Sequence, residues 1–300
     1  MLKRLAVVSL VMCASALAQQ ATSAMKLSAA QVAEKNVAAR GGLERWRKVQ
    51  VLVLRGEMEV GGNRRPALPL PGPKDKRLMP TPRPAEQVRL PFVMEMKRPL
   101  KSRIEVNFHG QSAVQVFDGA SGWKLRPFLN RREVEPYTDE ELKMAEQQFE
   151  LDGPLVDYAS KGSSLELVGM EKVGDQQTYN LKLTRRSGAT THIWIDAKTF
   201  LEAKIEGTPR RLDGRERAVE VYYRHFRNVD GLQIPFVLET RVAMTPGATP
   251  PAGQAPTAEQ IVLNKVEVNA PVADILFSKA SLTAPATVET APPQTEAAAR

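Results

Sequence analysis

The residues best suited to acid–base catalysis or zinc binding in this 300-residue chain are its three histidines, His109, His192 and His225. They lie far apart in the sequence, without the close spacing that zinc ligands on one element show. Asp118 and Asp152 each precede a glycine, a pattern that favours turns over acid–base roles. The chain also lacks a nucleophile elbow, a phosphate-binding loop and a dinucleotide-binding motif. We therefore expect no catalytic residues, no metal site and no cofactor.

The first residues indicate export. Two basic residues precede an apolar stretch over residues 5–17, and Ala16 and Ala18 supply small side chains at the spacing of a cleavage site. This pattern is typical of a secretory signal peptide, here residues 1–18, so we expect the mature protein to be exported. Lipidation of Cys13 is the alternative, but the methionine before it is bulky for such a site. Cleavage after Ala18 leaves no cysteine and therefore no disulfide.

The composition supports a folded core and argues against nucleic acid as a partner. Hydrophobic residues make up 42% of the chain, and the formal net charge is +8. The basic residues are scattered among acidic ones, without the dense basic arm or the basic–aromatic platform of nucleic-acid-binding proteins. We interpret the excess charge as solvated sheet faces, with contact to anionic lipid as the alternative. A monomer is expected.

Short runs of alternating apolar and polar side chains dominate the chain between residues 51 and 268. In the first run, Leu52 and Leu54 lie on the face opposite to Arg55. The same alternation recurs in Phe92/Met94/Met96, Ile104/Val106/Phe108, Tyr179/Leu181/Leu183, Val219/Val221/Tyr223 and Leu232/Ile234/Phe236/Leu238. A strict period of two is typical of antiparallel strands with one face in the core and the other in water. We predict ten or eleven strands that share one interior.

Two segments have the pattern of amphipathic helices. Ser28 and Gln31 have the spacing of a capping box, and so do Thr138 and Glu141. Because a helix with one apolar stripe must bury it, the open face of a curved sheet is the expected partner. The predicted fold class is α+β, a strongly curved antiparallel sheet with helices over its concave face.

The predicted domain covers residues 19–278. Two segments rich in proline, residues 61–91 and 244–257, read as irregular insertions between strands. The Ala/Pro/Thr-rich residues 279–300 are expected to form a disordered tail.

Two motifs in the first half carry a family resemblance. MKRPLKSRIEV at residues 96–106 and VFDGASGWKLRPF at residues 116–128 resemble the central hairpin of the LolA-like outer-membrane lipoprotein-sorting proteins. The order of signal peptide, opening helix, mid-chain helices and late strands is also similar. The resemblance implies an unclosed β-barrel with a hollow covered by helices, which carries acyl chains of lipoproteins through the periplasm.

The resemblance also directs attention to Arg98, which matches the functionally sensitive arginine in the family's K-R-P element. Independently, alternation places Arg98 at the end of the apolar face that contains Met94 and Met96, with Lys97 on the other face. A guanidinium there needs acceptors, because an unpaired buried charge is unstable. The polar end of an acylated cargo is one source of acceptors. A rim position from which the side chain reaches water is the other interpretation.

The leading hypothesis is a non-enzymatic periplasmic carrier for the acyl chains of lipoproteins or lipids, with transfer partners at the inner and outer membranes. The alternative is a structural or regulatory envelope protein that binds a protein partner through the same fold, without lipid. The candidate cavity residues are Leu54, Met94, Met96, Arg98, Val106, Val116, Leu183 and Phe236.

Overall fold

A computed structural model describes residues 27–61, 87–127, 131–148, 150–212, 215–242 and 258–282. The expected signal peptide, most of both expected insertions and most of the expected tail lie outside these residues. Among the described residues, no helix is both long enough and apolar enough to span a membrane.

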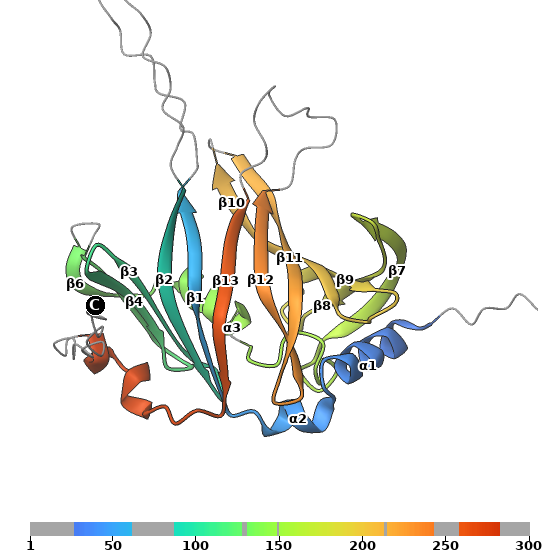
Figure 1. Ribbon diagram of the computed structural model, residues 1–300, viewed down its shortest axis with the longest axis horizontal. Helices are drawn as coiled ribbons and strands as arrows, with labels where there is room; N and C mark the ends of the chain where they lie inside the picture. The colour runs from blue at the N-terminus through green and yellow to red at the C-terminus, as the bar shows by residue number, and fades with distance from the viewer. Residues whose placement is uncertain are drawn as a thin grey trace, which may run out of the picture.

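A single antiparallel sheet of thirteen strands dominates the described part of the chain (Figure 1). The strands are β1 Val51–Gly61, β2 Gln87–Lys97, β3 Lys101–Phe108, β4 Gln111–Phe117, β5 Gly122–Arg126, β6 Arg131–Pro136, β7 Ser164–Val173, β8 Gln176–Thr184, β9 Thr190–Asp196, β10 Glu202–Leu212, β11 Arg215–Val229, β12 Leu232–Val242 and β13 Glu259–Val268. Their spatial order is β6-β5-β4-β3-β2-β1-β13-β12-β11-β10-β9-β8-β7. The predicted unclosed α+β sheet is confirmed, with more strands than expected.

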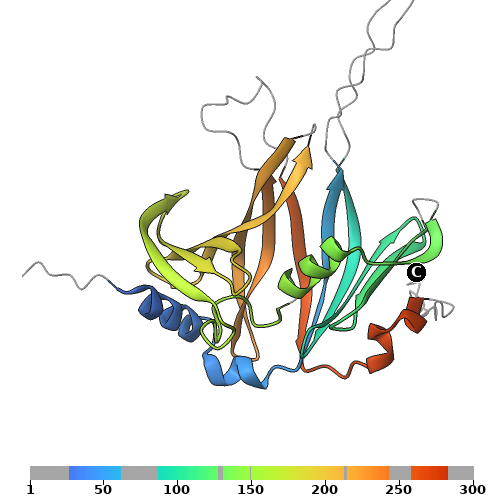
Figure 2. The same cartoon turned by 180° about the vertical axis from the view of Figure 1, so that it is seen from behind.

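The strand order explains how the concave face becomes covered. Strands β6 and β7 are consecutive in sequence but form the two opposite edges of the sheet. The chain between them must therefore cross from one edge to the other. It does so on the inner side of the curve, where α3 (Asp139–Gln148) and residues 150–162 lie (Figure 2). We call the side of the sheet on which this crossing segment lies the concave face.

Local capping signals set the helix starts. The Ser28 backbone N–H donates to Gln31 Oε1 at 2.9 Å and the Gln31 N–H donates to Ser28 Oγ at 3.2 Å, which starts α1 (Ala29–Ala39). The corresponding pair at Thr138 and Glu141, at 2.8 and 3.2 Å, starts α3. Both predicted capping boxes are confirmed. A short helix, α2 (Leu43–Lys48), joins α1 to the first strand.

Two element boundaries differ from the sequence-based expectation. Strand β2 begins at Gln87, inside the segment predicted to be irregular. Its Pro91 pairs with Glu57 of β1, whereas the pairing with β3 begins only at Phe92, so the missing proline N–H interrupts no ladder on that side. Residues 279–282 of the predicted tail form a 3-10 helix, η3 (Lys279–Leu282), which follows η2 (Asp274–Phe277).

The two faces of the sheet have opposite chemistry, as the alternation predicted. The convex face carries ladders of ion pairs, such as Arg103 with Glu105 at 2.6 Å and Lys204 with Glu220 at 2.7 Å. The concave face carries the largest apolar cluster. At the centre of the sheet, Gly56 sits at a register irregularity between β1 and β13, where a Cβ would lie 2.1 Å from the Val262 carbonyl oxygen. Only glycine permits this close approach.

Candidate binding face

Five of the predicted cavity residues meet in one apolar cluster on the concave face. Register explains the meeting, because Leu54 pairs with Met94 across β1 and β2, and Phe92 pairs with Val106 across β2 and β3. The five are Leu54, Met94, Met96, Val106 and Phe236, and we call the group that contains them the central cluster. Leu54, Met94, Met96 and Val106 are only half-buried. The central cluster is therefore apolar and partly accessible.

Two further predicted residues lie elsewhere. Leu183 is fully buried in a neighbouring cluster, where it packs with Leu181 and Ile193 and with Val32 of α1. Val116 lies on the convex face, where it packs against Phe277 and Leu282.

The reason for the position of Val116 is that β4 is covered on both faces. Val116 and Phe117 are consecutive and both fully buried, and consecutive strand residues point to opposite faces. Phe117 packs with Ala145 of α3, and Val116 packs under the C-terminal 3-10 helices. The candidate list therefore divides between the two faces of the sheet.

The crossing segment covers part of the central cluster. Leu151 and Val156 are buried within the cluster, and α3 packs through Leu142 and Ala145 against Met94. This segment is connected to the edges of the sheet only at its two ends. Its position on the concave face therefore depends on these apolar side chains and on polar contacts with neighbouring elements.

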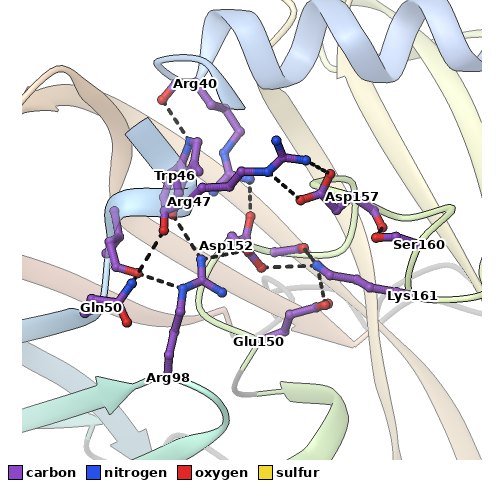
Figure 3. Close-up of polar contacts among 12 residues, drawn as sticks. Arg40, Trp46, Arg47, Gln50, Arg98, Glu150, Asp152, Asp157, Ser160 and Lys161 are labelled. Carbon is purple, nitrogen blue, oxygen red and sulfur yellow. Dashed lines mark hydrogen bonds and ion pairs between the residues drawn. The ribbon is translucent and has the colours of Figure 1, made fainter. Parts of the chain in front are cut away.

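Arg98, the remaining predicted residue, is the centre of those polar contacts (Figure 3). Its Nε donates to the Val49 carbonyl at 2.7 Å, and its Nη2 donates to the Trp46 carbonyl at 3.0 Å and to Asp152 Oδ2 at 2.9 Å. The acceptors that the guanidinium requires are thus supplied by the protein itself. These three hydrogen bonds occupy Nε and Nη2 without a cargo group, and the side chain remains 28% exposed to water.

Asp152 extends this network into the crossing segment. Its Oδ1 accepts from Lys161 Nζ at 3.1 Å, and its backbone carbonyl accepts from Arg40 Nη1 at 2.8 Å. Lys161 also pairs with Glu150. The side chain of Asp152 is only 6% exposed. We call Arg98, Asp152 and Lys161 the polar anchor, because together they tie the end of β2 and the end of α2 to the crossing segment.

A second, more exposed ion pair lies beside the polar anchor. Arg47 Nη2 is 2.8 Å from Asp157 Oδ1, and its Nε donates to Oδ2 at 3.1 Å. The hydrogen bond from Arg47 lowers the pKa of Asp157 below its ordinary value. This bidentate pair links α2 to the same crossing segment, but both partners face water.

Sequence reasoning assigned Asp152 to a turn and missed its ion pairs. The turn is present, since Gly153 has a φ of +81°. The D-G pattern thus predicts the backbone, while one partner of the carboxylate, Arg98, follows the end of β2 and is 54 residues away in the sequence. No local signal reports that pairing.

The described residues contain no group of three or more His, Cys, Asp or Glu side chains arranged to hold a metal ion. His192 makes a structural contact instead, with its Nδ1 2.8 Å from Asn180 Oδ1.

Comparison with known proteins identifies the fold. No family model matches the sequence, and no curated protein matches it significantly. Solved structures do match. A LolA superfamily protein from Nitrosomonas europaea superposes with a TM-score of 0.52 at 13% identity, over 85% of this chain and 100% of that one. The chain has a LolA-like fold. A DUF1329 family protein from Desulfovibrio piger gives a TM-score of 0.53 at 11% identity, over 86% of this chain and 100% of that one.

A third structure has the same LolA-like fold. It is a putative outer membrane lipoprotein-sorting protein domain from Vibrio parahaemolyticus, with a TM-score of 0.50 at 10% identity, over 85% of this chain and 98% of that one. At these identities the likeness concerns the fold alone.

Proposed function

We propose that this protein is a non-enzymatic periplasmic carrier that binds the acyl chains of lipoproteins or lipids against the central cluster. The observation that carries the proposal is the half-buried state of Leu54, Met94 and Met96 within an apolar wall whose opposite face is charged. An acyl chain laid on this wall would remove the remaining apolar surface from water. The LolA-like fold is consistent with this use.

The magnitude of the effect supports a measurable affinity. Each buried methylene contributes about 0.8 kcal/mol, so even a chain inserted over part of its length gains several kcal/mol. Methionine side chains suit such a site, because they are flexible and polarizable and adapt to chains of different shape. The crossing segment, held by the polar anchor and α3, already covers part of this wall. A bound acyl chain and the crossing segment would therefore both contact the wall.

The direct test is extraction of the protein purified from the periplasm, followed by mass spectrometry for copurified lipids and lipoproteins. An environment-sensitive apolar dye should bind the purified protein, and a long-chain acyl ligand should displace it. Absence of dye binding and of copurified lipid would reject the carrier function.

Met94→Gln should weaken acyl-chain binding about tenfold, because the exchange keeps the side-chain length but places an amide against methylenes, at a cost of about 1–2 kcal/mol. Dye displacement by a C16 acyl ligand measures the change. Met170→Gln is the matched control, since Met170 is 55% exposed on the edge strand β7, outside the central cluster. Equal effects of the two exchanges would show that the chain does not contact the central cluster.

A second candidate function is binding of a protein partner without lipid. A groove of about 500 Å³ opens between α1, α2 and the crossing segment, and two of its lining residues, Val37 and Leu43, also pack against the central cluster. Its lining is mainly apolar and includes Ala33, Val37, Leu43, Leu155 and Tyr158. This candidate takes the lead if the protein copurifies with a polypeptide and holds neither dye nor lipid.

A further inference from the structure

Arg227 is a cation on the apolar side of the sheet. It lies on β11 opposite Ile234 of β12, and residues paired across an antiparallel ladder share a face. Ile234 and Phe236 both belong to the central cluster. The Arg227 guanidinium carbon is 4.4 Å from the centroid of the Phe236 ring, and the side chain is exposed. The guanidinium therefore lies at the accessible border of the central cluster.

Within the described part of the chain, no carboxylate forms an ion pair with Arg227 and no acceptor forms a hydrogen bond with it. Its neighbour on the same strand behaves differently. Arg224, three residues earlier, points to the convex face and donates from Nε to Glu239 Oε2 at 3.2 Å. The two arginines thus differ in their partners, a carboxylate for Arg224 and an aromatic ring for Arg227.

The contacts of Arg227 leave its hydrogen-bonding capacity unused. The aromatic face attracts the guanidinium by a cation–π interaction, which fixes the position of the charge but takes up none of its five N–H donors. A planar guanidinium with free donors binds a carboxylate or a phosphate through two parallel hydrogen bonds. The central cluster thus offers apolar surface, and the Arg227 guanidinium at its border offers oriented donors for an anion.

We propose that Arg227 binds the anionic end of an amphiphile whose acyl chain lies on the central cluster. The ligand class is then an acyl or alkyl chain that ends in a carboxylate or a phosphate, bound in preference to an uncharged chain of equal length. This inference rests on the proposed carrier function and adds selectivity to it.

Three C16 ligands separate charge from chain: hexadecanoate, hexadecyl phosphate and hexadecanol, each used to displace the apolar dye from the full mature protein. Wild type should bind the two anionic ligands about tenfold more tightly than the alcohol, as expected for a charge-assisted hydrogen bond. Comparison of hexadecanoate with hexadecyl phosphate shows which oxyanion the site prefers. Arg227→Gln should abolish the difference between the anionic ligands and the alcohol, while hexadecanol binds as before.

Arg55→Gln is the matched control, because it removes the same charge from the convex face, where Arg55 pairs with Glu267. It should change neither ligand class. Arg227→Lys keeps the charge but lacks the planar fork, so an intermediate loss for the anionic ligands is expected. An equal loss for all three ligands in Arg227→Gln would mean that Arg227 acts by packing alone, and would overturn the inference. A wild type that binds hexadecanol as tightly as the anions would overturn it while leaving the carrier function intact. A wild type that binds none of the ligands would reject both.

Discussion

Asp152→Ala is expected to lower the free energy of unfolding by about 3 kcal/mol, the usual effect of breaking a buried ion pair. The carboxylate is almost fully buried between Arg98 Nη2 at 2.9 Å and Lys161 Nζ at 3.1 Å. Its removal leaves two neighbouring cations without their shared counter-charge. Arg98 and Lys161 are 28% and 30% exposed, so water moderates the loss but cannot replace both contacts. Urea unfolding followed by tryptophan fluorescence measures the change.

Arg47→Ala provides the comparison for this prediction. Arg47 pairs with Asp157 of the same crossing segment, but that pair faces water, and exposed ion pairs contribute little to stability. The unfolding midpoint of Arg47→Ala should stay close to that of the wild type. A double-mutant cycle of Asp152→Ala with Arg98→Leu then isolates the pair itself. If the two effects simply added, Arg98 and Asp152 would not interact in solution.

The parts of the fold that follow from local sequence were predictable. Alternation assigned Leu54, Met94 and Phe236 to one face, because a period of two is fixed by the backbone of a strand. The starts of α1 and α3 followed from Ser28 and Thr138 for a similar reason, since a capping box lies within four residues. The same alternation, continued from Tyr223, also places Arg227 on the concave face, although the sequence gives no sign that it lacks an acidic partner.

The strand count was underestimated at the edge of the sheet. Strand β6 has the sequence RREVEP, in which charged residues occupy both faces. An edge strand with one neighbour and exposed sides has little need of alternating apolar side chains, and its charges discourage pairing with other chains. Such a strand is recognisable only when its neighbour, here β5, is known.

The position of Val116 required information that its own strand does not contain. Alternation within β4 separates Val116 from Phe117 but cannot say which of them faces inward, because both are apolar. The answer comes from η2 and η3, some 160 residues later in the chain, which cover the convex face of β4. Residues 279–282 were expected to belong to the tail because their composition resembles that of the residues that follow them.

Phe277→Ala is therefore expected to have the largest effect among the apolar exchanges, about 3–5 kcal/mol of unfolding free energy. Phe277 is 1% exposed and packs with Val114 and Val116 on a face that would otherwise expose apolar surface to water. Chemical denaturation measures the loss. Acyl-chain binding should survive in the folded fraction, because Phe277 lies on the opposite side of the sheet from the central cluster.

Ile275→Ala is the control for this exchange, since Ile275 lies in the same 3-10 helix but is 59% exposed. It should change the unfolding free energy by less than about 0.5 kcal/mol, as surface exchanges usually do. The contrast between two apolar residues in one short helix tests packing and not local helix stability. Similar small effects at both positions would mean that the C-terminal 3-10 helices do not pack on β4 in solution, and the apolar convex face of β4 would then need another cover.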